Sequence, residues 1–169
     1  MTRARPKPKR RQTLVFRTYT LLDELQASAT EPMPVEKRDY QIGRMKKALE
    51  SIERAPKPAI ADWRMLSDAV NIVETLIEGG VAEDGTGLLH DAMAALAHAG
   101  RRSLETPGTP IRLDGPGLLA VRAVLESYEE ILAAIPARVA IAAHRRTERR
   151  IQEIHSGKRR PHDVEVMAI

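Results

Sequence analysis

Apolar residues recur every three or four positions along most of the chain, which is the spacing of one face of an α-helix. The clearest stripe lies between residues 61 and 78 and consists of Trp63, Leu66, Val70, Val73 and Ile77. Asp62 complements the helix dipole at the first turn, and Gly79 and Gly80 allow the chain to leave the helix. The pattern predicts a helix whose stripe faces the core.

The same periodicity predicts a helix on each side of this segment. The first spans residues 35–54 and ends there because Pro56 and Pro58 follow. Its expected inner face consists of Tyr40, Met45, Leu49 and Ile52. The other spans residues 88–102, and its expected inner face consists of Leu89, Met93 and Leu96. The alanines of this second helix would let a neighbouring backbone come close.

The last predicted helix begins at Asp114, which is expected to cap it, and runs to about Ile154. A heptad spacing continues through Leu118, Val121, Leu125, Tyr128, Leu132, Ile135, Val139 and Ala142. Pro136 lies within this helix and predicts a kink, or a split into two helices near residues 133–136. The heptads leave two interpretations open: the spine of a monomeric bundle, which is the commoner case, or the seam of a homodimer.

We therefore predict a mainly α protein, a four-helix bundle with a long C-terminal helix. Residues 20–27 are expected to add one or two helical turns. Residues 13–17 and 109–113 have the composition of two short strands that pair with each other. The expected organisation is a basic disordered arm over residues 1–12, one helical domain over residues 13–155 and a flexible basic tail over residues 156–169.

The composition narrows the functional classes. Apolar residues make up 43% of the 169 residues but aromatic residues only 3%, so small aliphatic side chains must build the core. The absence of cysteine excludes disulfides, thiolate nucleophiles and cysteine-based zinc sites. No apolar run reaches the roughly 20 residues that span a bilayer, and no apolar segment follows the basic start as in a secretory signal. We expect a cytoplasmic protein that does not enter a membrane.

Candidate catalytic and metal-binding residues do not form a recognisable pattern. The five histidines are His90, His98, His144, His155 and His162. They show neither an HExxH motif nor an i, i+4 pair with a second ligand, and the acidic residues offer no facing pair for acid–base catalysis. The stretches EDGTG and DGPG fit a turn and a helix start better than a phosphate-binding loop. We expect no enzyme activity, no cofactor and no metal site.

The charge of the chain is asymmetric, although its net value is only +4. Residues 1–17 carry seven Lys or Arg and no acid, residues 18–137 carry twelve against nineteen acids, and residues 138–160 carry eight against two. Clustered cations neutralise phosphates and release counterions, which gives a salt-dependent affinity for nucleic acid. The candidate nucleic-acid-binding residues are Arg3, Arg5, Lys7, Lys9, Arg10, Arg11, Arg138, Arg145, Arg146, Arg149, Arg150, Lys158, Arg159 and Arg160. The alternatives for these cations are a solvated helix end and an acidic protein partner.

Recognition of base edges is not expected. The connection at residues 79–87 is far longer than the three or four residues of a helix-turn-helix turn. The alanine-rich helix that follows offers few side chains for reading the major groove. Few exposed aromatic residues are predicted, so recognition of single strands by base stacking is not expected either.

Three segments stand out together: ADWRMLSDAVNIVETLIEGG, the alanine-rich helix ending in RR, and IRLDGPGLLAVRAVLESYEEIL. In this order they resemble a family of small helical proteins from proteobacterial prophages and other mobile elements. The likeness covers residues 58–155, and Asn71–Leu76 matches an N-I-V-E-x-L element of the family. Some members are labelled transcription regulators, and the resemblance implies no catalytic or binding residues. Pro136 departs from the uninterrupted last helix of the family.

These observations support one leading hypothesis. We expect a non-catalytic accessory protein of a mobile element that binds nucleic acid through its basic termini, with regulation as one role. The alternative is a protein–protein interaction module, such as an inhibitor or adaptor of a host or phage protein. The choice between DNA and RNA, and between monomer and homodimer, stays open.

Overall fold

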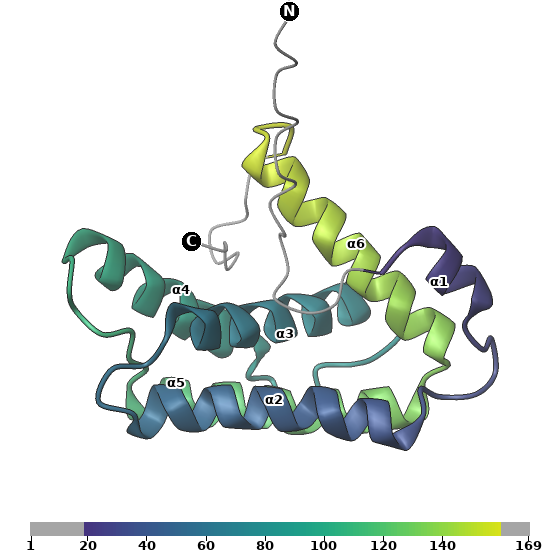
Figure 1. Ribbon diagram of the computed structural model, residues 1–169, viewed down its shortest axis with the longest axis horizontal. Coiled ribbons are helices and arrows are strands. Elements are labelled where there is room, and N and C mark those ends of the chain that lie inside the picture. Colours follow the sequence, from purple (N-terminus) through teal and green to yellow (C-terminus); the bar gives the residue numbers. More distant parts are fainter. Residues whose placement is uncertain (1–18, 160–169) are drawn as a thin grey trace, which may run out of the picture.

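The computed structural model describes residues 19–159, which form six α-helices and contain no strand (Figure 1). The helices are α1 (Leu21–Gln26), α2 (Val35–Arg54), α3 (Ile60–Glu78), α4 (Leu89–Glu105), α5 (Gly115–Ala134) and α6 (Ala137–His155). The predicted mainly α class is confirmed. The finer prediction of a four-helix bundle is not confirmed, because α3 takes a central place and packs against α2, α4, α5 and α6.

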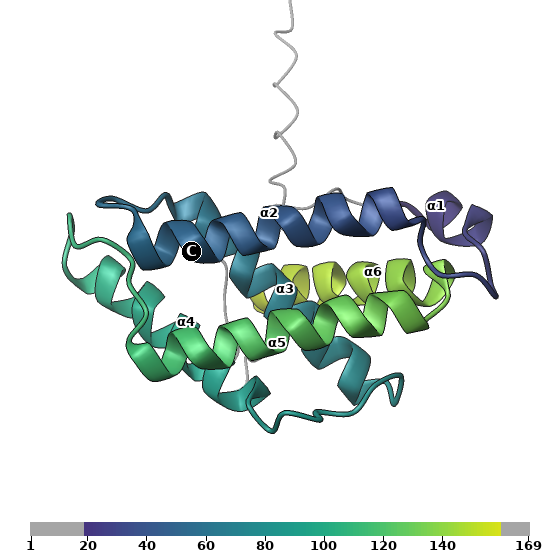
Figure 2. The ribbon, with the colours of Figure 1, turned by 90° about the horizontal axis from the view of Figure 1, so that it is seen from below.

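Helices α2 and α5 lie side by side in one layer, and α3 and α4 pack over them (Figures 1 and 2). Helix α6 starts beside the end of α5 and rises across α3, so that its last turns stand above the rest of the molecule (Figure 1). Helix α1 packs against α6. The chain therefore places α1 and α6 together on one side of the layers.

Helix α3 forms the centre of the core. Eleven of its 19 residues are buried, more than one apolar stripe can supply, because neighbours cover it on several sides. Of the predicted stripe, Ile77 is partly buried and the other four members are fully buried. The indole nitrogen of Trp63 donates a hydrogen bond of 2.9 Å to the carbonyl oxygen of Leu96 on α4, so this large side chain is buried without losing its polar contact.

Local signals set several helix boundaries where the sequence predicted them, although α4 continues to Glu105 and does not end at residue 102. Asp114 caps α5, because its Oδ1 accepts a hydrogen bond of 2.8 Å from the Gly117 N–H. Gly80, with φ +66°, turns the chain after α3, and the Val81 N–H then donates to the Leu76 carbonyl oxygen at 2.9 Å. Helix α2 has the predicted limits.

Pro136 divides the predicted last helix into α5 and α6, so the chain takes the split rather than the kink. In α5 the heptad positions from Val121 to Leu132 are buried within the protein itself. Beyond the break the buried face changes: Val139 and Ala142 are only partly covered, while α6 buries Ala140, Ile141, His144, Thr147, Arg150 and Ile151. Polar side chains therefore enter the contact of α6 with the core.

Two finer expectations are not met. Tyr40 is 70% exposed, whereas Met45, Leu49 and Ile52 are buried. The placement of Tyr40 was wrong because residues five apart on a helix point about 140° away from each other. Residues 109–113 form no strand, and their expected partner segment lies outside the described residues, as does the predicted arm.

A substitution at Gly117 tests the close contact between α4 and α5. A Cβ at this position would lie 2.7 Å from the Ala95 Cβ and 2.7 Å from the capping Oδ1 of Asp114. We expect Gly117→Ala to lower the free energy of unfolding by about 1–3 kcal/mol, because the helices must move apart. Gly43 within α2 has open space around it, so Gly43→Ala should raise the same quantity by about 0.5–1 kcal/mol. Urea denaturation of both variants measures the difference, and equal effects would contradict this packing.

Candidate functional site

Residues 138–160 form the second basic block of the chain. Its described cations divide into those that hold the fold together and those that face solvent. Arg150 belongs to the first group, because its side chain is only 6% exposed and pairs with Glu74 and, at 3.3 Å, with Glu78 of α3. It also donates a hydrogen bond of 3.3 Å to the carbonyl oxygen of Asn71. A buried guanidinium needs such partners because its charge has lost most of its hydration. Arg150 thus links α6 to α3.

Arg138 and Arg145 link α6 to α1. The Arg138 guanidinium donates to the carbonyl oxygens of Leu25 and Ala27, each at 3.1 Å, where the end of α1 leaves carbonyls without helical partners. Arg145 forms an ion pair with Glu24 of α1. Because α1 has no buried residue, these polar contacts rather than apolar packing attach it to α6.

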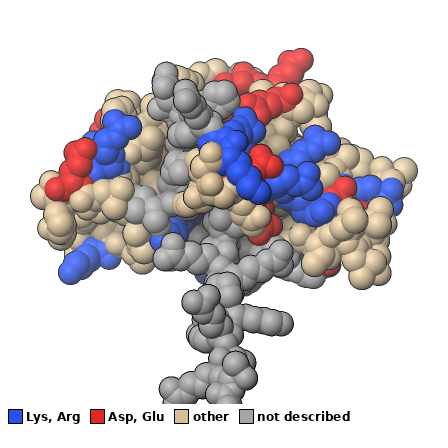
Figure 3. Space-filling model, turned by 90° about the horizontal axis from the view of Figure 1, so that it is seen from above, with Lys and Arg blue, Asp and Glu red and all other residues tan. Residues whose placement is uncertain are grey.

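Arg146, Arg149 and Lys158 are exposed, and their side chains form no hydrogen bond or ion pair in the described part of the chain. Arg159 is partly buried and has contacts of its own. Figure 3 shows Lys and Arg side chains gathered over the α6 side of the upper face, with acidic side chains among them. We call Arg146 and Arg149 of α6, together with Lys158 just after its end, the α6 cations.

Residues 1–17, the first basic block of the chain, lie outside the described residues. So do seven candidate site residues, namely Arg3, Arg5, Lys7, Lys9, Arg10, Arg11 and Arg160. The described chain begins at Tyr19, whose ring meets the imidazole of His144 edge to face with the ring centroids 5.3 Å apart. His144 lies near the middle of α6. The chain therefore enters the structure beside the helix that carries the second basic block.

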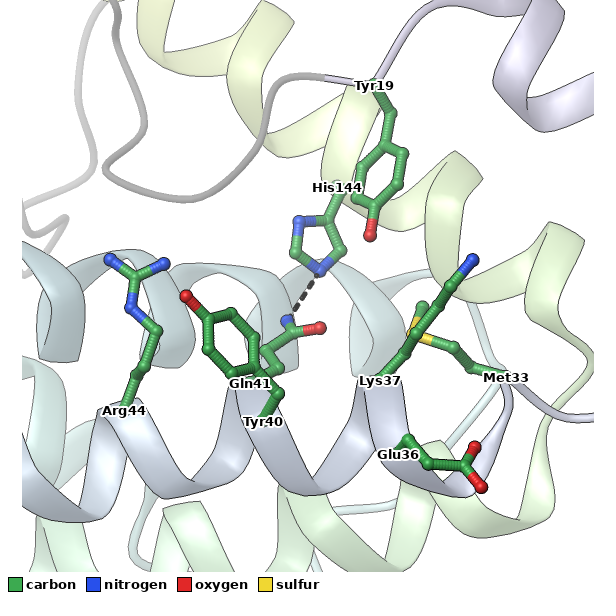
Figure 4. A pocket seen from close by; sticks show the side chains of 8 residues that line it. All are labelled: Tyr19, Met33, Glu36, Lys37, Tyr40, Gln41, Arg44 and His144. Carbon is green, nitrogen blue, oxygen red and sulfur yellow. Dashed lines mark hydrogen bonds between the residues drawn. The ribbon is translucent and has the colours of Figure 1, made fainter.

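A pocket of about 370 Å³ opens between the first half of α2 and α6 (Figure 4). Its lining consists of Tyr19, Met33, Glu36, Lys37, Tyr40, Gln41, Arg44 and His144. Lys37, Tyr40, Gln41 and Arg44 stand at positions i, i+3, i+4 and i+7 of α2, so they project from one helix face. One helix, α6, thus carries both the exposed cations and a wall of this pocket.

Three side chains form a hydrogen-bonded group at the inner end of the pocket. The Tyr128 hydroxyl lies 3.0 Å from Nε2 of His144, and Nε2 of Gln41 lies 3.4 Å from that hydroxyl and 3.2 Å from the imidazole nitrogen. Burial lowers the pKa of His144 to about 4, so the imidazole is neutral near pH 7. Burial also raises the pKa of Tyr128, so its hydroxyl keeps its proton while it accepts a hydrogen bond from the Gln41 amide.

The sequence did not indicate this pocket. Tyr40 was expected in the core, and His144 shows no motif that separates it from the other histidines. Helix geometry alone could have indicated one wall of the pocket. It places four residues on one face of α2, away from Met45: Lys37, Tyr40, Gln41 and Arg44. Nothing in the spacing shows that His144 of α6 lies opposite that face, because the two helices are far apart in the sequence.

Other classes of site receive no support from the geometry. In residues 19–159 no group of three or more His, Asp or Glu side chains is placed to hold a metal ion. No helix in the same part of the chain is long and apolar enough to cross a bilayer. No family model, curated protein or solved structure matches this chain.

His144 should make stability depend on pH. The unfolded residue takes up a proton below about pH 6.5, whereas the folded one resists protonation down to about pH 4. The unfolded state therefore binds more protons in this window, and stability falls as the pH drops through it. Between pH 7 and pH 5 we expect the wild type to lose about 2 kcal/mol more of its unfolding free energy than His144→Gln. Denaturant titrations at both pH values measure this, and equal losses would refute the assignment.

Proposed function

We propose that this protein is a non-catalytic, nucleic-acid-binding accessory protein of mobile elements. Its cations would contact phosphates, and regulation is the role that such binding fits best. Arg146 and Arg149 support the proposal, because they stand three residues apart on one exposed face of α6. Phosphate contacts of this kind fix a protein on a nucleic acid without reading its sequence.

One observation carries the proposal: Tyr19 packs against His144 of α6. Arg11 is eight residues from Tyr19, so the extended chain between them covers at most about 28 Å. Helix α6 ends at His155, eleven residues beyond His144, which corresponds to roughly 17 Å along the helix, and Lys158 follows three residues later. The covalent chain therefore limits Arg11 to about 28 Å from Tyr19, a span that is enough for this end of the first basic block to contact the α6 cations. Two blocks that act on one stretch of phosphates would bind more tightly than either alone.

The alternative function, a protein–protein interaction module, is favoured by a different surface. Leu21, Leu22 and Leu25 of α1 are 55%, 61% and 60% exposed. Neighbouring exposed leucines on so short a helix are typical of a contact site for another protein. This surface lies on α1, whereas the proposed nucleic-acid contacts lie on α6, so variants can separate the two functions.

A salt titration tests the proposal. We expect wild-type protein to bind a DNA or RNA oligonucleotide at about 50 mM salt and to lose affinity steeply as salt rises. Arg146→Glu combined with Arg149→Glu should reduce the slope of log affinity against log salt by about 2, one for each lost phosphate contact. Fluorescence anisotropy across a salt series measures the slope.

Lys57→Glu combined with Arg101→Glu is the matched control. It changes the net charge equally but replaces exposed cations in the connection between α2 and α3 and on α4, away from α6 (Figure 1). We expect the control slope to equal that of the wild type. Equal slopes for both double variants would contradict binding through α6. No binding of the wild type to DNA or RNA at low salt would overturn the proposal and favour the α1 surface.

A further inference from the structure

We propose that the pocket between α2 and α6 binds an unpaired nucleotide of single-stranded nucleic acid, with the base against Tyr40 and its phosphates on Lys37 and Arg44. This inference rests on the proposed function and deepens it. It names the form of nucleic acid that the protein prefers and a contact that the α6 cations cannot make.

The aromatic wall is the first argument. The sequence predicted few exposed aromatic residues and therefore no base stacking, but Tyr40 is 70% exposed. It stands at the edge of the pocket, on the side away from Tyr19 (Figure 4). The Arg44 guanidinium lies 5.8 Å from the centroid of the Tyr40 ring. An exposed tyrosine beside an arginine is a platform on which a nucleobase can stack, and such stacking holds single strands without strict sequence preference.

The second argument is a hydrogen-bond acceptor that faces the cavity. The amide nitrogen of Gln41 is held by Tyr128 and His144, which fixes the orientation of the whole amide group. Its oxygen forms no hydrogen bond in the described part of the chain, and Figure 4 shows it pointing into the pocket. A fixed acceptor of this kind matches the amino groups and ring N–H groups on the edge of an unpaired base.

The charge of the pocket is the third argument. The side chains of Lys37 and Arg44 form no hydrogen bond or ion pair with any described residue, and Glu36 is the single acid among the lining residues. With neutral His144 the lining carries a net charge of +1, which complements an anionic ligand. The two cations stand two helical turns apart on either side of Tyr40, so a backbone that passes along α2 could meet both while its base turns inward.

The same features disfavour a duplex and an acidic peptide in this pocket. A base in a duplex is stacked and paired, so its face and edge cannot reach Tyr40 and Gln41 without first leaving the helix. An acidic peptide would satisfy the two cations but would leave the tyrosine face and the Gln41 oxygen without matched partners. The volume of about 370 Å³ lies in the range of pockets that hold small ligands or single groups of larger ones.

The test compares one oligonucleotide of about 12 nucleotides as a single strand and as a duplex. We expect Tyr40→Ala to weaken single-strand binding about tenfold, through the loss of one stacked base, and to leave duplex binding unchanged. Alanine favours a helix, so α2 should persist, which circular dichroism and thermal melting verify. Leu119→Ala on α5 is the control, because it removes another large exposed side chain that lies outside the pocket.

A matched pair of variants tests the role of the pocket cations. Arg44→Gln should weaken single-strand binding, whereas Lys47→Gln should not, because Lys47 is exposed on α2 but does not line the pocket. Fluorescence anisotropy with labelled oligonucleotide measures all four variants. Equal losses for Arg44→Gln and Lys47→Gln would mean that only the general charge of α2 matters, and would overturn the pocket assignment.

The outcomes separate the two proposals. If the wild type binds both forms of nucleic acid and Tyr40→Ala weakens neither, the pocket assignment is wrong while the proposed function stands. If neither form binds, the proposed function itself fails, and a nuclear magnetic resonance titration with adenosine monophosphate then examines the pocket alone. Shifts at Tyr40 and His144 with that mononucleotide, but no oligonucleotide binding, would overturn the assignment to a strand and identify a free-nucleotide site.

Discussion

The position of α6, and therefore the surface that this helix forms, depends on the buried ion pair between Arg150 of α6 and Glu74 of α3. A guanidinium in the core is costly unless carboxylate and carbonyl oxygens replace its water, and α3 supplies both kinds of partner. The contact is directional, so it allows few positions of α6 over α3. Thr147 adds to it, because its hydroxyl lies 2.7 Å from that of Thr75 on α3. A polar contact of this kind specifies the place of a helix more narrowly than alanine packing does.

The break at Pro136 makes this contact possible, because α6 can then run in a different direction from α5. Because α6 crosses α3, His144 on one of its faces lies opposite α2 and lines the pocket. Arg146 and Arg149, on another face, are exposed to solvent. Arg138 and Arg145 then hold α1 against the same helix. The arginines of α6 thus serve three purposes: to bind the core, to bind α1 and to face outward.

The sequence predicted the helices well because their signals are local. Asp114, Gly80 and Pro136 act on the backbone within a few residues, and the apolar stripe of α3 shows which residues it buries. Tyr40 could have been placed correctly from helix geometry alone.

The candidate site was harder to predict because its signals depend on distant partners. Arg149 and Arg150 look alike in the sequence, yet one is exposed and the other is buried. The partners of Arg150 on α3, namely Glu74, Glu78 and the Asn71 carbonyl oxygen, lie more than seventy residues earlier and separate the two. The pocket likewise requires knowing that His144 lies opposite Gln41, which no spacing reveals.

The division of labour among these arginines is the central claim, and a comparison of Arg150→Gln with Arg149→Gln tests it most directly. Each folded variant is measured for its unfolding free energy and for its affinity for an oligonucleotide. We expect Arg150→Gln to lose about 3 kcal/mol of stability, because it removes the guanidinium that neutralises the mostly buried Glu74 carboxylate, and to keep its affinity while folded. Arg149→Gln should change stability by less than about 0.5 kcal/mol and weaken binding. Equal stabilities for the two variants, or a loss of affinity confined to Arg150→Gln, would contradict the account.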